Sequence, residues 1–411
     1  APLTAEAGAD GCTVQKGDAS LLISGDILSP SGIYTGGSVL VGADGRIQCV
    51  GCDCAAQGAA ATQIVCPDAV VSPGLINAHD HIGWMNDKPW WAADNGVDPA
   101  IRWEHRHDWR KGKRGNPKIS TGGGGASEDE KAFGELRFAL GGGTAIFGSG
   151  DTAGVLRDLD RTGGGDSGLG HGGAEYNTFP LGDSDGKVLA SGCSYGDAPS
   201  KPTGASAPHV SEGIDPEARN EFLCLTGQGD GGTDVLGGDA AIIHGVGLDA
   251  VDAGYMASKG IALIWSARTN ISLYGETARV TLMDRMGVQI GLGSDWLPSG
   301  SMNMLRELAC ADYLNTNHFG EYFSDADLWG MATSGSAAAL GFDDVIGSLV
   351  TGYVADIAIF AKEGRAAHRA VIEANVGSTI LVLRGGKAVV GNASVVDGLE
   401  AAFLAQALHG H

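Results

Sequence analysis

Early in the chain, an apolar run ends in two histidines that are separated by one residue, within VVSPGLINAHDHIGW. In a strand, residues i and i+2 point to the same side, so His79 and His81 could contact one ion. Pro73 and Gly74 favour a tight entry into this segment, and Asn77 is placed to support a ligand. The motif therefore predicts a metal-binding strand end.

Three later segments place polar side chains at the ends of apolar runs. PHVSEGID contains His209 with Glu212 three residues on, AIIHGVGLD contains His244, and IGLGSDWLPSGS contains Asp295. Taken alone, each histidine is compatible with a structural role, and Asp295 with a turn or a helix cap. Taken together, in this order and each at the end of a predicted strand, they predict one metal site.

The middle of the chain, residues 73–345, must position these side chains. Its strand-like runs are TAIFGSG, GKVLASG, KPTGASAPHV, AAIIHGV, IALIWSA and VQIGLGSD, and helical stretches such as EDEKAFGELRFALGG and PEARNEFLCLTG separate several of them. Alternating strands and helices predict a parallel sheet, and so many units predict a closed barrel, which takes about 250 residues. Three Gly-rich tracts lack the Lys-Ser/Thr pair of a phosphate loop and are interpreted as surface insertions: STGGGGASEDE, RTGGGDSGLGHGGAEYN and GQGDGGTDVLGGD.

Both ends of the chain show a different pattern. Short apolar runs alternate with Gly, Asp and Ser turns in residues 18–72 and again in residues 346–398. These blocks predict one small β-sandwich domain formed from both chain ends. The predicted fold class is therefore α/β, a (β/α)8 TIM-like barrel with that small domain, and residues 399–411 are predicted to be a C-terminal tail or helix.

The overall charge excludes some partners. The formal net charge is −22, which argues against nucleic acid or an anionic membrane surface, because phosphate contacts need a basic face. No stretch of 18 apolar residues is present, so we expect no membrane span. We expect a small-molecule substrate, and the sequence is compatible with a homo-oligomer.

The cysteines carry a second signal. The chain has eight, of which five fall in its first 66 residues: Cys12, Cys49, Cys52, Cys54 and Cys66. The run CVGCDC resembles half of a zinc ribbon, but no second CxxC or Cys/His pair follows, so disulfides are favoured over a structural zinc. The opening APLTAEAGADGC resembles a mature terminus left after removal of a signal peptide or lipoprotein anchor. A periplasmic or extracellular location is therefore favoured over the cytoplasm.

PGLINAHDH, followed far downstream by His209, His244 and Asp295, resembles the amidohydrolase superfamily over nearly the whole chain. The sequence is most similar to the branch that contains cytosine, guanine and S-adenosylhomocysteine deaminases and triazine chlorohydrolases. The resemblance implies that His79, His81, His209 and Asp295 bind one divalent metal, with Zn²⁺ favoured and Fe²⁺ as the alternative.

The same resemblance implies catalytic roles. Asp295 would take a proton from the metal-bound water, Glu212 would pass a proton to a ring or leaving nitrogen, and His244 would orient the nucleophile and stabilise developing charge. The predicted function is hydrolysis of a C–N bond, by deamination or by ring or amidine hydrolysis of a small, N-containing substrate that could be heterocyclic.

Two alternatives stay open. Related amidohydrolases that act as amidases or peptidases on acylated amino acids hold two metals, bridged by a carboxylated lysine after strand four. Lys187 is the candidate for that lysine, although it lies near the start of its apolar run, and the HVSE motif favours one metal. The other alternative is a catalytically silent binding protein on the same fold, against which the retained Glu212 argues.

Candidate substrate-binding residues lie mainly in WMNDKPWWAADNGVDPAIRWEHRHDWRKGKR. Its aromatic side chains could stack on a planar substrate or pack the barrel rim: Trp84, Trp90, Trp91, Trp103 and Trp109. Its basic side chains could bind a carboxylate or face solvent: Arg102, Arg106, His105 and His107. Arg268 could meet an anion or form a rim salt bridge. EHRH is expected to lie inside a helix, which would point its two histidines apart.

Overall fold

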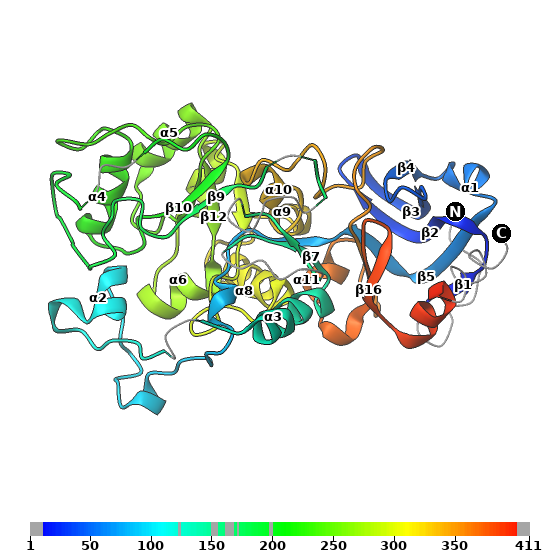
Figure 1. Cartoon of the computed structure of the whole chain (residues 1–411), viewed down its shortest axis with the longest axis horizontal. Coiled ribbons are helices and arrows are strands. Elements are labelled where there is room, and N and C mark those ends of the chain that lie inside the picture. Colours follow the sequence, from blue (N-terminus) through cyan, green and yellow to red (C-terminus); the bar gives the residue numbers. More distant parts are fainter. Residues whose placement is uncertain are drawn as a thin grey trace.

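The structure is a computed structural model that describes residues 11–121, 125–148, 155–160, 168–170, 172–196 and 200–400. Figure 1 shows a β-rich part built from both chain ends, with the blue strands beside the red strand β16. The middle of the chain forms a separate mass of parallel strands and helices. In the described part of the chain, no helix is both long and apolar enough to cross a membrane.

One eight-stranded sheet joins the two chain ends. The order is β16-β15-β14-β5-β2-β3-β4, with β1 paired to β5, and β5 runs antiparallel to β14 from Ala69↔Ala361 to Pro73↔Ile357. Its strands are β1 (Thr13–Gln15), β2 (Asp18–Ser29), β3 (Gly32–Val41), β4 (Ile47–Gly51), β5 (Ala61–Pro73), β14 (Ile357–Ala361), β15 (Thr379–Arg384) and β16 (Lys387–Gly391). The short helix α1 (Cys54–Gln57) lies between β4 and β5.

The middle of the chain forms two parallel sheets. The first contains β6 (Leu75–Asn77), β7 (Gly143–Ile146) and β8 (Arg157–Asp158). The second contains β9 (Glu175–Asn177), β10 (Ser206–Val210), β11 (Ala241–His244), β12 (Ala262–Trp265) and β13 (Ile290–Leu292). The residues of β10 to β13 are buried throughout, as expected for parallel strands that are covered on both faces.

Helices follow most of these strands, and residue type explains where several begin. Ser127 and Glu130 form a capping box at α3, Asp215 caps α4 ahead of Pro216, and Asp249 caps α5. The α-helices of this part and of the C-terminal block are α2 (Arg106–Lys111), α3 (Glu128–Leu140), α4 (Pro216–Leu225), α5 (Ala250–Lys259), α6 (Ala267–Tyr274), α7 (Val280–Arg285), α8 (Met304–Asn317), α9 (Asp325–Met331), α10 (Ser334–Ala339) and α11 (Arg369–Ile372). The short 3₁₀ turns are η1 (Ile82–Trp84), η2 (Ala93–Asn95), η3 (Lys113–Gly115) and η4 (Val376–Ser378).

Two expectations about the strands are wrong. Residues 186–192, predicted as a strand, form turns and irregular chain. In contrast, β9 lies at the end of the Gly-rich tract 161–177, which the sequence favoured as a surface insertion. The reason is that β9 is only three residues long and is defined by its pairing with β10 rather than by an apolar pattern of its own.

Residues 393–400 are helical. The tail or helix predicted for residues 399–411 stays a prediction, because residues 401–411 lie outside the described part of the chain.

The structure pairs six of the eight cysteines. The bridges are Cys12–Cys66, Cys49–Cys54 and Cys193–Cys224, while Cys52 and Cys310 are free. Since Cys49 and Cys54 bond to each other, CVGCDC does not supply the ligand set of a zinc ribbon.

We predict that the native protein gains the mass of six hydrogen atoms on full reduction, because three bridges open. Replacing both Cys193 and Cys224 by Ala should lower the free energy of unfolding by about 3 kcal/mol, since this bridge closes a long loop in the unfolded chain. Intact-mass spectrometry and urea unfolding measure the two effects. The exposed Cys52, replaced by Ala, is the control, and a native protein with eight free thiols would contradict the pairing.

Candidate metal centre and active site

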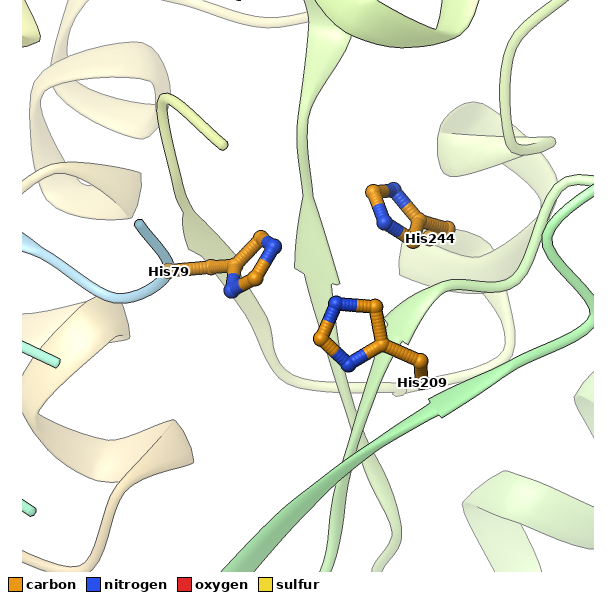
Figure 2. A group of neighbouring side chains, drawn as sticks. All are labelled: His79, His209 and His244. Carbon is orange, nitrogen blue, oxygen red and sulfur yellow. The ribbon is translucent and has the colours of Figure 1, made fainter. Parts of the chain in front are cut away.

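Four strands bring the predicted ligands to one place. His79 follows β6, His209 lies in β10, His244 ends β11, and Asp295 follows β13. Because these strands are parallel, their carboxyl ends meet at the same edge, where sites on such folds are built. Figure 2 shows the rings of His79, His209 and His244 converging on a common space.

The ligand atoms face one another at short range. His79 Nε2 lies 3.1 Å from Asp295 Oδ1, and His81 Nε2 lies 3.5 Å from the same oxygen. His209 Nε2 is 3.3 Å from His81 Nε2. His244 also has a ring nitrogen within 4.8 Å of those of His79 and His209. The structure thus brings together all the residues that the sequence proposed as metal ligands.

The backbone approaches closely here and adopts unusual conformations. His244 has φ 75° and Asp295 has φ 61°, both in the left-handed region, which costs non-glycine residues on the order of 1–3 kcal/mol each. A side chain at Gly293 would lie 2.7 Å from Cβ of His79, so only glycine fits beside that ligand. Such conformations persist where the surrounding structure holds them, and they are typical of functional sites.

Hydrogen bonds orient the imidazoles. His209 Nδ1 donates to the carbonyl of Asn177 at 3.3 Å, which leaves the lone pair of Nε2 facing the centre. The Tyr176 hydroxyl lies 3.0 Å from His81 Nδ1. Both Tyr176 and Asn177 come from β9, a strand that the sequence pattern missed, so these partners could not be anticipated.

Asn77 supports the loop that carries the ligands. Its side-chain oxygen accepts from the backbone N–H of Ser294 at 3.0 Å, and its amide donates to Ser294 Oγ at 2.6 Å. Ser294 Oγ in turn donates to Asp80 Oδ2 at 2.7 Å, and burial raises the pKa of Asp80 to about 7. Asn77 therefore ties β6 to the segment that carries Asp295.

Burial sets the charge of the ligands. Burial and the neighbouring imidazoles lower the pKa of His81 to about 4 and hold that of His209 well below its usual range. Burial alone would raise the pKa of Asp295, but its hydrogen bond to His79 and the nearby histidines hold it well below the ordinary value. At neutral pH, His81 and His209 are therefore neutral imidazoles and Asp295 is a carboxylate.

Glu212 and His244 lie side by side next to the ligands. Glu212 Oε2 is 3.7 Å from His244 Nε2, and Glu212 Oε1 accepts a hydrogen bond from Tyr274 at 2.8 Å. Trp109 Nε1 donates to the Tyr274 hydroxyl, also at 2.8 Å. Burial raises the pKa of Glu212 to about 8, so it is mostly protonated at neutral pH. Sequence reasoning did not single out Tyr274.

The hydrogen bonds of Asn270 define the tautomer of His244. Asn270 Oδ1 accepts from Thr277, so its amide group faces His244 and donates to Nδ1 at 3.3 Å. The proton of the neutral ring is then on Nε2, which faces Glu212. Burial lowers the pKa of His244 to about 3, which keeps the ring neutral. His244 therefore presents an N–H donor rather than a lone pair at this side.

A cavity of about 520 Å³ opens onto these groups. His81, His209, His244, Glu212 and Asp295 line one part of it, and the indole rings of Trp84, Trp109 and Trp296 line another. Trp84 and Trp109 lay in the tract that the sequence singled out, whereas Trp296 was missed although it directly follows Asp295.

The other aromatic residues of that tract have different surroundings. Trp103 is buried in the cluster that includes Trp109, Trp90 packs against this cluster, and Trp91 is exposed.

The three candidate arginines differ in position. Arg106 lines the cavity, but it is buried and bonded to Asp183 at 2.5 Å and to Glu221 at 3.5 Å. Arg102 and Arg268 are exposed and are not among the residues that line the cavity.

The EHRH segment was expected to lie inside a helix, but only part of it does. The helix α2 begins only at Arg106, and His105 is its extended N-cap, so the rings of His105 and His107 lie 5.0 Å apart instead of diverging. His107 Nε2 lies 2.8 Å from Asp183, and His105 Nε2 lies 3.4 Å from Glu221. Since these carboxylates also bind Arg106, the group forms a buried ion-pair network.

Lys187 does not reach the centre. Its ammonium group donates to the carbonyl of Ser194, and the residue does not line the cavity. In the sheet, β9 lies next to β10. The residue of β9 that lies beside His81 is Tyr176, not a lysine.

Comparison with known proteins finds similarity to part of this chain. Residues 233–390 match the model of the amidohydrolase family. The 5-methylthioadenosine/S-adenosylhomocysteine deaminase of Thermococcus kodakarensis is 35% identical over 127 residues, and that of Archaeoglobus fulgidus, the deaminase 2, is 28% identical over 130 residues. The first alignment covers 30% of each chain, and the second covers 32% of this chain and 31% of the relative, so the chain matches under a third of these relatives' length.

Solved structures share the fold over almost the whole chain. An adenosine deaminase from Xanthomonas campestris with bound zinc is 15% identical, with a TM-score of 0.61 over 93% of this chain and 97% of its own. An atrazine chlorohydrolase from Arthrobacter aurescens complexed with zinc is 18% identical, with a TM-score of 0.60 over 93% and 99%. The fold is thus the α/β fold of amidohydrolases, and the chain is similar to the amidohydrolase family model over residues 233–390 and to deaminases and a triazine chlorohydrolase.

Proposed function

We propose that this protein is a metal-dependent hydrolase that activates water to attack a C–N bond, by deamination or by ring or amidine hydrolysis of a small N-containing substrate. The observation that carries the proposal is the convergence of His79, His81, His209 and Asp295 at one cavity, beside Glu212. The names of the similar deaminases support hydrolysis of a C–N bond, and the similar chlorohydrolase supports hydrolysis more generally.

We further propose that the two parallel sheets together form a (β/α)8 barrel. Parallel bridges at both boundaries support this closure, since Asp80 pairs with Asp295 and Asp160 pairs with Ala174. The first bridge lies directly at the ligands, because Asp80 separates His79 from His81. Barrel closure would therefore fix the distance between the first ligand pair and Asp295.

The donor set suits a single Zn²⁺, with Fe²⁺ as the alternative. Three neutral imidazoles and one carboxylate are typical ligands of these ions, and the bond from His209 Nδ1 to Asn177 leaves Nε2 free to bind. The zinc in both similar structures supports this choice. Bound there, the ion would lower the pKa of a water molecule towards about 7 and so provide hydroxide at neutral pH.

The protein's own groups would handle the protons. The carboxylate of Asp295 accepts the proton that the attacking water loses, because it is ionised and lies at the ligand group. Glu212, which is mostly protonated, donates to the ring or leaving nitrogen, and Tyr274 holds its carboxyl group in place. His244 donates its Nε2–H to the oxygen that develops negative charge at the attacked carbon.

Two observations favour one metal over two. A second metal would need the lone pair of His244, but the amide of Asn270 faces Nδ1 and places the ring proton on the opposite nitrogen. It would also need a bridging lysine, and Lys187 is bonded elsewhere while Tyr176 lies beside His81. The two-metal amidase or peptidase is therefore disfavoured. A silent binding protein is disfavoured too, because it has no need for a buried, oriented Glu212.

We propose a periplasmic or extracellular location. The three disulfide bridges support an oxidising compartment, in which such bonds form and persist.

Replacing Asp295 by Asn or Ala should reduce kcat by about 10³-fold or more, because the ligand and proton acceptor is lost. Asn tolerates the left-handed backbone at this position, so the Asn variant should keep its fold. Steady-state kinetics against a panel of aminated N-heterocycles and acylated amino acids, with circular dichroism for the fold, measures both effects. A folded Asn variant with unchanged turnover would remove Asp295 from the mechanism.

Replacing Glu212 by Gln should lower kcat by about 10²–10⁴-fold and leave the metal content unchanged, since Gln keeps the shape but cannot donate the proton. The matched control is Glu276→Gln, which alters an exposed carboxylate outside the cavity and should have no effect. Elemental analysis and kinetics on the same samples separate the two roles. Normal turnover in the Gln variant would end the proton-transfer role of Glu212.

A further inference from the structure

The cavity is also lined by basic side chains, although the chain as a whole is strongly acidic. Arg110, Lys111 and Lys118 face the same space as the metal ligands, in a protein with a formal net charge of −22. The side chains at this wall of the cavity are thus positively charged, whereas the chain as a whole is negatively charged. The bulk of the surface would repel an anion, whereas this cavity would attract one.

These three cations differ from Arg106 in their pairing within the described part of the chain. Arg106, which also lines the cavity, is paired with two buried carboxylates and serves the ion-pair network described above. In contrast, none of Arg110, Lys111 and Lys118 forms an ion pair with an acid among the described residues. Their positive charge is therefore available to a ligand.

Arg110 is nevertheless held in a defined position. Its Nη2 donates to the carbonyl of Ser184 at 2.5 Å, and its Nη1 lies 3.1 Å from His107 Nδ1. The guanidinium carbon lies 4.2 Å from the centre of the Phe179 ring, which also lines the cavity. All three partners are uncharged, since burial lowers the pKa of His107. The arrangement orients the guanidinium without a direct ion pair, while Asp183, Glu212 and Asp185 act on its charge from a longer distance.

The acids that line the cavity are fewer than the basic side chains that line it. They are Glu212 and Asp295, which belong to the reaction centre, and Glu212 is mostly protonated at neutral pH. The cations instead lie on or next to α2, which also supplies Trp109. One short segment of chain therefore brings basic and aromatic side chains to the same wall.

The aromatic side chains form a continuous group. The ring centres of Trp84 and Trp296 are 5.8 Å apart, and those of Trp109 and Trp296 are 5.2 Å apart. Indole rings at such a site offer flat apolar surface to a planar ring. A ligand that matches the whole cavity would combine a flat ring with a negatively charged group.

We propose that the substrate is a planar, N-containing ring that carries an anionic group, a carboxylate or a phosphate. The ring lies against Trp84, Trp109 and Trp296, and Arg110, Lys111 and Lys118 bind the anion. The inference rests on the proposed hydrolase function for the reaction at the ring, but the anion-binding subsite can be tested without any turnover.

The binding test uses inorganic phosphate and benzoate as probes, measured by isothermal titration calorimetry on the metal-loaded protein. The variant is Lys111→Gln/Lys118→Gln, and the matched control is Lys113→Gln, an exposed cation of the same segment that does not line the cavity. We expect the double variant to weaken binding of the preferred probe by about tenfold or more and the control to leave it unchanged. Preference for phosphate or for benzoate distinguishes the two anion classes. Failure of both probes to bind, or equal binding by the double variant, would overturn the subsite.

The kinetic test compares adenosine with adenosine 5′-monophosphate and adenosine-5′-carboxylic acid. For the charged probe that is turned over, the double variant should raise KM by about tenfold and leave kcat unchanged, because a remote group adds equally to ground-state and transition-state binding. Turnover of adenosine alone would refute the anionic substrate and leave the hydrolase proposal intact. If none of the three is turned over, the binding test decides on the subsite by itself.

Discussion

The gathering of buried imidazoles around a buried carboxylate is the constraint on which the rest of the site depends. Asp295 is 3% exposed and ionised, and His79 and His81 direct ring nitrogens at the same oxygen. A buried charge costs several kcal/mol unless it is paired. A divalent cation among these ligand atoms would compensate the carboxylate and use every lone pair that faces it. The strained backbone at His244 and Asp295 is compatible with a cation bound at this centre.

Around this centre, separate elements orient the histidines and Glu212 and form the cavity wall. Strand β9 orients His81 and His209 through Tyr176 and Asn177, while α6 supplies Asn270 and Tyr274, which direct His244 and Glu212. The segment that contains α2 supplies the cavity wall. Its buried network of Arg106, Asp183 and Glu221 anchors this segment to chain that is distant in sequence. Reactive groups therefore lie at or just after the ends of regular strands, and most of the groups proposed to select a substrate lie on the connection after β6.

Much of the site could be anticipated because its ligands end long apolar runs. The segments that contain His79, His209, His244 and Asp295 each show a strand pattern followed by a polar residue, and parallel order brings their ends together. The sequence also predicts a small β-sandwich domain from both chain ends, and the structure joins these ends in one eight-stranded sheet.

What could not be predicted depends on tertiary pairing. Strands β8 and β9 are two and three residues long, too short for a periodic pattern, so Tyr176 stayed hidden in a Gly-rich tract. Arginine is a residue type that often binds anions, so Arg106 was a reasonable candidate. Its ion-pair partner Asp183, however, lies 77 positions away in the sequence and pairs with its charge. The sequence did not single out Arg110 and Lys111, which line the cavity.

The most direct test of the central claim is the crystal structure of the zinc-loaded protein, with anomalous diffraction measured on both sides of the zinc absorption edge. The account predicts one anomalous peak per chain at this centre, bonded to Nε2 of His79, His81 and His209 and to the carboxylate of Asp295, with His244 outside bonding distance. A second peak bonded to His244, or no peak among these side chains, would contradict it.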